Sequence, residues 1–134
     1  AARLMALNGA DLLLYPTAIG WDIHEKNKEE NLRQKEAWEM IQRSHSIANG
    51  LPVVVCNRVG IEMSEDGHHG IEFWGSSFVA GQQGELIESA SSDKSSLLVC
   101  EVDFSRTEYV RRIWPYLRDR RIDAYDGLLK RYLD

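Results

Sequence analysis

Cysteine is scarce in this sequence, with two among 134 residues. Both follow short apolar runs: Cys56 comes after three valines, and Cys100 comes after Leu-Leu-Val. Such surroundings predict buried, reduced thiols, as in a cytosolic protein, and not a disulfide. Cys56 could instead be a nucleophile, because Arg58 stands two residues away and a cation stabilises a thiolate. We favour the structural role for Cys56.

Long apolar runs are also missing, so no membrane-spanning helix is expected. The formal net charge is -5, which gives no sign of a nucleic-acid-binding surface. Neither a phosphate-binding loop nor a dinucleotide-binding fingerprint occurs. With 43% hydrophobic and 28% charged residues, the composition is that of one ordinary globular domain. The sequence therefore predicts no nucleic-acid partner and no membrane partner.

Metal-ligand patterns are missing too. His68 and His69 are adjacent in a polar loop, but neighbouring side chains converge poorly on one metal, and no second His or Cys pair stands at ligand spacing. We expect exposed loop histidines, no metal and no cofactor. Gly75-Ser76-Ser77 lacks the second glycine of a nucleophile elbow, which favours a turn at a strand edge.

Apolar periodicity and turn residues predict an α/β protein, with a mixed sheet and helices packed on one face. Asn-Gly pairs are expected to end the first two helices. The expected helices cover residues 1–7, 29–49 and 106 onward, and the expected strands cover residues 11–15, 52–57, 71–74, 77–80, 86–90 and 95–104.

Finer features of these elements can also be predicted. The strands at 11–15 and 52–57 have the composition of strands buried on both faces. Ser105, with Glu108 three residues later, has the pattern of a capping box. His45 is interpreted as a packed or hydrogen-bonded structural residue, not a catalytic one. The apolar side of the long helix is predicted to contain Ala37, Ile41, Ser44 or His45, and Ala48.

The first seven residues already have a helical pattern, with no start methionine and no N-cap residue before them. We therefore expect the chain to be a portion of a longer protein. Such a portion would expose sheet edges and apolar faces, so we also expect oligomerisation or poor solubility of residues 1–134 alone.

One segment is placed where a pocket would form. Open α/β sheets bind ligands beyond the carboxyl ends of their strands, and residues 17–22 follow the first expected strand. The acidic residues here have a second interpretation, as a solvated face. Composition and spacing alone predict a possible pocket near Thr17 and no particular reaction.

Several segments together resemble the nitrilase superfamily of carbon–nitrogen hydrolases, and most of all its N-carbamoylputrescine amidase branch. The resemblance covers essentially the whole chain. The matching segments are Ala-Ala-Arg-Leu-Met-Ala-Leu-Asn-Gly-Ala-Asp at 1–11, Tyr-Pro-Thr-Ala-Ile-Gly at 15–20, Ala-Asn-Gly at 48–50, Asn-Arg-Val-Gly at 57–60, Phe-Trp-Gly-Ser-Ser-Phe at 73–78 and Arg-Asp-Arg-Arg-Ile-Asp-Ala-Tyr at 118–125.

The resemblance implies a four-layer α-β-β-α sandwich, with residues 1–134 as the C-terminal portion of a single hydrolase domain. It implies hydrolysis of a linear carbon–nitrogen bond, with N-carbamoylputrescine as the expected substrate and a Cys-Glu-Lys triad as the catalytic group. Alternatives are a noncatalytic assembly module and a related amidase of the ω-amidase or β-ureidopropionase type.

The family's triad has no counterpart in this sequence. Its cysteine stands before a Phe-Pro-Glu motif, ahead of the segment that matches Ala1, and Cys56 matches a different position. The resemblance therefore implies no catalytic residue in this chain, and we expect the chain alone to be inactive.

The resemblance does imply a pocket wall. Thr17 and Ala18 match the segment that lines the family's substrate site. Asp22 stands where a carboxylate could meet the ammonium group of a cationic substrate, although a solvated loop acid is the equal alternative. Asn57, Arg58 and Gly75 are interpreted as structural elements near that site.

The arginine-rich tail implies a homo-oligomer, because tails of this kind cross a subunit interface in the family. Arg118, Arg120 and Arg121 could pair with carboxylates of a partner copy. The alternative is local pairing with Asp119 and Asp123, which contributes little to stability.

Overall fold

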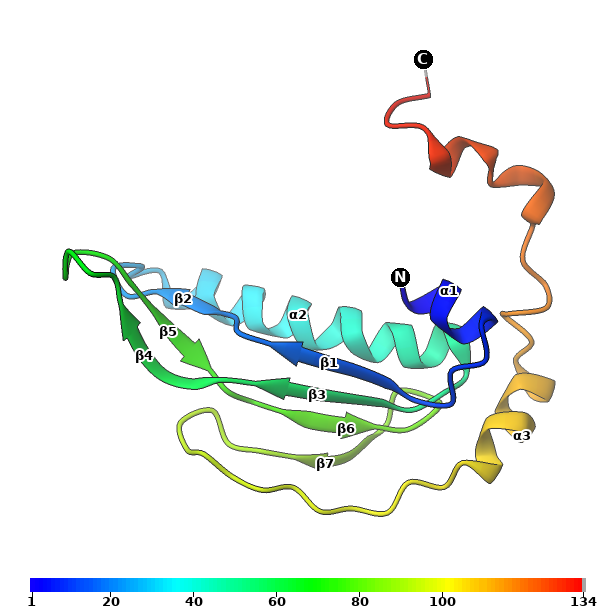
Figure 1. Ribbon diagram of the computed structural model, residues 1–134, viewed down its shortest axis with the longest axis horizontal. Helices are drawn as coiled ribbons and strands as arrows, with labels where there is room; N and C mark the ends of the chain where they lie inside the picture. The colour runs from blue at the N-terminus through cyan, green and yellow to red at the C-terminus, as the bar shows by residue number, and fades with distance from the viewer. Residues whose placement is uncertain (134) are drawn as a thin grey trace.

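The computed structural model describes residues 1–133, which form two sheets, three α-helices and two short 3-10 helices (Figure 1). Their bounds are α1 (Ala2–Leu7), β1 (Leu13–Thr17), β2 (Gly20–Asp22), α2 (Lys28–Asn49), β3 (Val53–Asn57), β4 (Val59–Met63), β5 (Gly70–Trp74), β6 (Phe78–Ala80), β7 (Leu86–Ser89), α3 (Ser105–Ile113), η1 (Ile122–Ala124) and η2 (Asp126–Leu129).

The larger sheet has the strand order β1-β3-β6-β7. Its first pair is parallel, with Leu13 opposite Val53 and Thr17 opposite Asn57, and its other pairs are antiparallel. The smaller sheet is antiparallel, in the order β2-β5-β4. The predicted mixed sheet is therefore confirmed.

Helix α2 is the long part of the crossover that a parallel pair requires. The Asn27 side chain caps its start by accepting a hydrogen bond from the Glu30 N–H at 3.1 Å. Gly50 ends it in the left-handed conformation, at φ +57°, as the Asn-Gly pair predicts. In Figure 1, α2 lies along one face of the sheet.

The core lies between α2 and strands of both sheets and is rich in aromatic rings. Trp38 of α2 meets Trp74 edge-on at 5.8 Å and Phe78 at 6.0 Å, measured between ring centroids. Trp21 extends the cluster, 5.2 Å from Trp74. Around these rings the core is completed by Ala2, Ala6, Leu13, Leu51, Val53, Val55 and Ala80.

The prediction for the buried face of α2 is wrong. Ala37 and Ile41 are exposed, and the helix buries Trp38, Gln42, Ser46 and Asn49. The reason is that three of the four buried side chains on this face are polar, so apolar periodicity does not mark it. The Ser46 hydroxyl, for example, donates to the Gly81 carbonyl oxygen.

The prediction that the first two strands are buried on both faces is also wrong. In β1 burial alternates, and Leu14 is 63% exposed. β1 also includes Pro16, which an edge strand tolerates because one side needs no N–H donor. In β3, Val53 and Val55 are buried but Cys56 is exposed.

The cysteines are free, as predicted, but they are not buried. Cys56 is exposed and Cys100 is half-buried. The expected strand at 95–104 does not form, because this segment runs extended beyond β7 without joining its ladder (Figure 1). Two strands, β2 and β4, were not predicted, since one has three residues and the other continues into a polar hairpin.

The predicted capping box of α3 is wrong as well. The helix begins at Ser105, so this residue is inside it, and the Asp103 carboxylate accepts hydrogen bonds from the Ser105 N–H at 2.8 Å and hydroxyl at 2.6 Å. These bonds lower the pKa of Asp103. Glu108 pairs with Arg112, one turn later.

Replacing Trp38 with alanine should lower the free energy of unfolding by about 3–5 kcal/mol, because a large ring is removed from a closed core. Met40 on the same helix is 70% exposed, so Met40→Ala should change it by no more than about 0.5 kcal/mol. Urea unfolding of the two variants measures both values. Equal losses would contradict the assigned helix orientation.

Candidate active-site wall

The parallel strands β1 and β3 end side by side, with Thr17 opposite Asn57. Because both strands run in one direction, the groups that follow them meet at one edge of the sheet. Residues 18–19 leave β1 at this edge, and Arg58 follows β3. The segment predicted to line a substrate site therefore stands at the carboxyl edge.

The Asn57 side chain connects the segments that meet there. Its Nδ2 donates to the carbonyl oxygens of Ile19 and Gly75, each at 3.0 Å. Its Oδ1 accepts from the Ile19 N–H at 3.0 Å and lies 3.1 Å from the Thr17 hydroxyl. The single Thr17 proton is shared with the Cys56 carbonyl oxygen, 3.0 Å away.

The turn between β5 and β6 forms the other side of this edge. Gly75 has φ +53°, and a Cβ there would come within 2.9 Å of the Ser91 and Ser92 carbonyl oxygens, so the position requires glycine. Ser76 is also left-handed, at φ +56°. Ser77 accepts a hydrogen bond from the Asn57 N–H at 2.9 Å. The Gly-Ser-Ser segment is thus the expected turn.

The two predicted wall residues differ in exposure. Thr17 is half-buried and its hydroxyl is engaged as described, whereas Ala18 is exposed. Ala18 is followed by Ile19, which is held by Asn57 through both its backbone N–H and its carbonyl oxygen. The assignment of Thr17 and Ala18 to a substrate site stays a prediction.

Asp22 ends β2 and is exposed. Its Oδ1 accepts a hydrogen bond from the His24 N–H at 2.8 Å. It lines a cavity of about 380 Å³ whose walls do not include Thr17 or Ala18. Across the small sheet, Asp22 and Glu62 both stand opposite Ile71, so the three side chains share one face.

Arg58 has a role that the sequence did not reveal. Its guanidinium lies over the Phe73 ring, 4.4 Å from the centroid, and forms an ion pair with Glu62 at 2.5 Å. Phe73 and Glu62 line the same cavity as Asp22. A cation of the protein itself therefore occupies one part of this acidic, aromatic surface.

A second cavity, of about 350 Å³, opens beside Asn57. Its lining is polar and basic and includes Arg58, Lys94, Ser77, Ser91, Ser95 and Ser96. The lining residues Ser91, Lys94, Ser95 and Ser96 come from the segment after β7, so residues far apart in sequence share this cavity.

The histidines stand where they were predicted. His68 and His69 are exposed in the loop, and the His24 ring contacts the His68 carbonyl oxygen at 2.6 Å. His45 stacks on Tyr15 at 6.1 Å, and its burial lowers its pKa. Within residues 1–133, no three His, Cys, Asp or Glu side chains are grouped to hold a metal ion.

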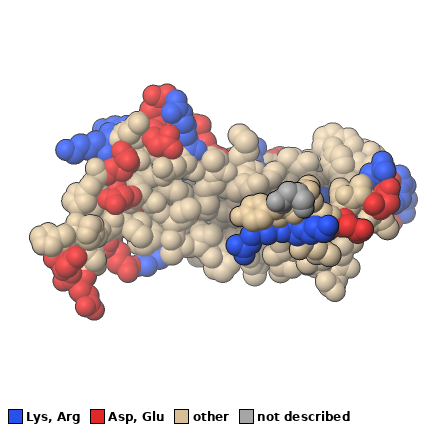
Figure 2. Space-filling model, turned by 90° about the horizontal axis from the view of Figure 1, so that it is seen from above, with Lys and Arg blue, Asp and Glu red and all other residues tan. Residues whose placement is uncertain are grey.

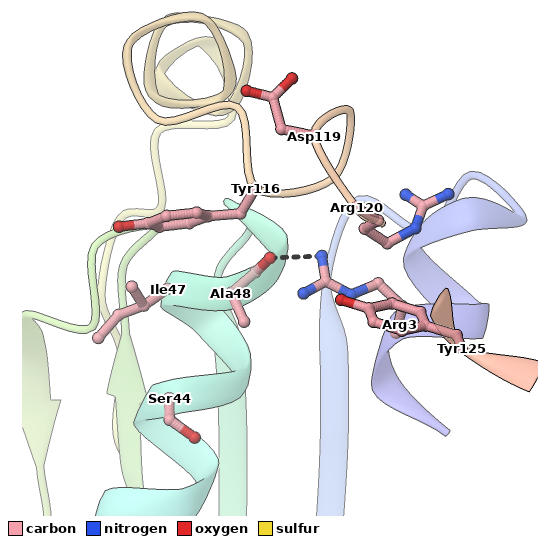
Figure 3. Close-up of a pocket in the computed structure, with 8 residues that line it drawn as sticks. All are labelled: Arg3, Ser44, Ile47, Ala48, Tyr116, Asp119, Arg120 and Tyr125. Atoms are coloured by element: carbon pink, nitrogen blue, oxygen red, sulfur yellow. Dashed lines mark hydrogen bonds between the residues drawn. The ribbon is translucent and has the colours of Figure 1, made fainter. Parts of the chain in front are cut away.

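The tail meets the body of the molecule at a cavity of about 440 Å³ (Figure 3). Arg3 of α1 donates to the Ala48 carbonyl oxygen at 2.6 Å and faces Tyr125 of the tail. Burial, and next the charge of Arg120, lower the pKa of Arg3. This contact joins the tail to α1 and α2.

The tail arginines pair locally. Arg118 binds Asp119 at 2.7 Å and Arg121 binds Asp123 at 2.6 Å, all of them exposed. Arg120 donates to the Leu117 carbonyl oxygen. These contacts match the local alternative for the tail.

Residues 1–112 match the carbon-nitrogen hydrolase family. The chain belongs to this family. None of the helices in residues 1–133 has both the length and the apolar character needed to cross a membrane.

Two curated relatives illustrate the match. N-carbamoylputrescine amidase of Solanum tuberosum is 40% identical over 131 residues, which are 96% of this chain and 42% of that protein. Citrullinase of Francisella tularensis is 36% identical over 132 residues, or 98% of this chain and 44% of that protein. The chain thus spans less than half the length of these relatives.

Solved structures agree with the fold. A carbon-nitrogen hydrolase from Helicobacter pylori G27 has a TM-score of 0.93 at 55% identity, covering 98% of this chain and 45% of that one. A Nesterenkonia amidase from the nitrilase superfamily has a TM-score of 0.66 at 22% identity, which bears on the fold alone. The predicted nitrilase-like α/β fold is therefore confirmed.

Proposed function

We propose that the protein containing this chain hydrolyses a linear carbon–nitrogen bond in a carbamoyl or amide substrate, with N-carbamoylputrescine as the favoured one. The match of residues 1–112 to the carbon-nitrogen hydrolases is the observation that carries this proposal. The similarity to an N-carbamoylputrescine amidase favours the substrate. Water would convert it to putrescine, carbon dioxide and ammonia, a step of polyamine biosynthesis placed in the cytosol.

The resemblance to the family supplies the proposed chemistry. A cysteine thiolate attacks the carbonyl carbon, a lysine stabilises the oxyanion, and a glutamate moves protons as the amine or ammonia leaves. Water then hydrolyses the thioester-type intermediate. Residues 1–134 have no counterpart of this triad, so we assign them the pocket wall and assign the nucleophile to the rest of the protein.

A substitution of Cys56 tests whether the nucleophile lies outside residues 1–134. Cys56 is exposed on β3, and in sequence it does not match the family's nucleophile. Cys56→Ala in the intact protein should leave ammonia release from N-carbamoylputrescine within about twofold of the unchanged protein, since a surface substitution costs little. The isolated chain should release none.

Turnover by residues 1–134 alone that disappears in Cys56→Ala would make Cys56 the nucleophile and overturn the proposal. A Cys100→Ala variant is the matched control, because Cys100 is also free and lies in the unpaired segment after β7.

Asp22 is the residue we assign to the ammonium end of the substrate. Its cavity combines carboxylates with Ile71 and Phe73, which suits an alkyl chain that ends in a cation. Glu62 already pairs with Arg58, whereas no ion pair of Asp22 is found within residues 1–133. Figure 2 shows acidic side chains at the end of the molecule that carries the small sheet, interspersed with Lys and Arg side chains.

Asp22→Asn in the intact protein should lower kcat/KM for N-carbamoylputrescine by about tenfold, or about 1.4 kcal/mol, while an uncharged carbamoyl alkane loses little. Asparagine keeps the acceptor for the His24 N–H, so the local turn survives. Ammonia release measured with both substrates gives the ratio of their kcat/KM values.

Asp66→Asn is the matched control for Asp22. Asp66 is also exposed and accepts from the N–H two residues later, at 2.9 Å from His68, but it lies outside the cavity. An unchanged ratio in Asp22→Asn would remove Asp22 from the site and favour an amidase for neutral or anionic substrates.

We also propose that the protein is a homo-oligomer joined through the tail. Large apolar side chains of the tail are exposed on the chain by itself, and a second copy would cover them. They are Ile122, Leu128, Leu129, Tyr132 and Leu133.

Leu129 is 93% exposed on this chain, and the proposed interface would cover it. Leu129→Asp should therefore place an acid in that interface and shift the intact protein toward smaller species in sedimentation velocity. Leu97→Asp is the control, with an equally large side chain, 86% exposed, outside the tail. Equal sedimentation of Leu129→Asp and the unchanged protein would contradict the tail interface.

A further inference from the structure

We propose that Asn57 is a positioning residue, whose side chain holds residues 17–19 in the conformation that receives the substrate. The inference rests on the proposed function, because it gives a role to the wall formed by Thr17 and Ala18. Asn57 is the group that sets the shape of that wall. Asn57 itself need not contact the substrate.

Every hydrogen-bonding position of the Asn57 side chain has a partner. An amide has two N–H donors and one oxygen with two acceptor positions. Both donors are used, on the carbonyl oxygens of Ile19 and Gly75, and the oxygen accepts from the Ile19 N–H and faces the Thr17 hydroxyl. Aspartate has the same shape but no donor when ionised, so it cannot reproduce this set.

The segment that Asn57 holds has no ladder of its own. Ala18 and Ile19 lie between β1 and β2, and neither takes part in strand pairing. Asn57 binds the N–H and the carbonyl oxygen of Ile19 together, as a neighbouring strand would. Without it, Ala18 and Ile19 would form a connection between two paired strands in which the Ile19 backbone groups have no partner from the sheet.

Asn57 is itself firmly placed. Its backbone pairs with Thr17 in the parallel ladder, and its N–H donates to the Ser77 hydroxyl at 2.9 Å. Gly75, which accepts its second donor, is fixed by a hydrogen bond from its own N–H to the Arg58 carbonyl oxygen at 2.9 Å. Hydrogen bonds therefore fix the position of the wall relative to the sheet, which is the condition for holding a substrate to within an ångström.

The test compares Asn57→Asp and Asn57→Ala in the intact protein, with N-carbamoylputrescine as the substrate. At pH 8 both variants should raise KM about tenfold with a smaller change in kcat, because the hydrogen bonds that fix the wall to the sheet are lost. The two facing carbonyl oxygens should raise the pKa of the new carboxyl. Lowering the pH toward 5.5 should then protonate this carboxyl and restore one hydrogen-bond donor. The difference in KM between Asn57→Asp and the unchanged protein should therefore become smaller, whereas that for Asn57→Ala should not.

Asn49→Asp is the matched structural control. Asn49 is buried and its Nδ2 donates to the His45 carbonyl oxygen at 2.7 Å, away from the carboxyl edge. This variant should lower the melting temperature and leave KM unchanged. Hydrogen exchange gives a readout without substrate: the Ile19 amide should exchange faster in Asn57→Ala, which removes its acceptor.

A raised KM with faster Ile19 exchange supports the positioning role. Faster exchange with an unchanged KM makes Asn57 structural only and overturns it, as does unchanged exchange. If the unchanged protein hydrolyses no carbamoyl or amide substrate, the proposed function fails and takes the positioning role with it, while faster Ile19 exchange would still show the hydrogen-bond connection.

Discussion

The parallel pairing of β1 with β3 is the constraint on which the rest of the structure depends. Parallel neighbours require a long crossover, and the 22-residue helix α2 supplies it and covers the sheet. The same pairing brings Thr17 and Asn57 to one edge. The core and the candidate wall thus follow from one topological choice, with Trp38 closing the core above the strands that carry the edge.

Polar side chains hold backbone segments that lie outside the strand ladders. Ser46 and Asn57 both use side-chain hydrogen bonds to bind backbone groups that no strand satisfies, one beneath α2 and one at the carboxyl edge. Directional hydrogen bonds of this kind fix a unique arrangement, because each polar group loses its partner if the segment shifts. The edge where the substrate is proposed to lie is therefore held by directional bonds as well as by packing.

Much of this could be predicted from the sequence, for identifiable reasons. The Asn-Gly pairs marked the ends of α1 and α2, and the motif at 15–20 pointed to the carboxyl edge and to the family. The buried face of α2 could not be predicted, because Gln42 and Ser46 are polar. The links made by Asn57 join residues up to 40 positions apart, and no local pattern encodes such contacts.

We propose that the carboxyl edge of β1 and β3 is the substrate wall. The most direct measurement is a crystal structure of the intact protein, with its nucleophile replaced by alanine, soaked with N-carbamoylputrescine. We expect the carbamoyl group to lie against Thr17 and Ala18, with Ile19 still bound to Asn57. Ligand found at the opposite, amino-terminal ends of these strands, with the carboxyl edge empty, would contradict it.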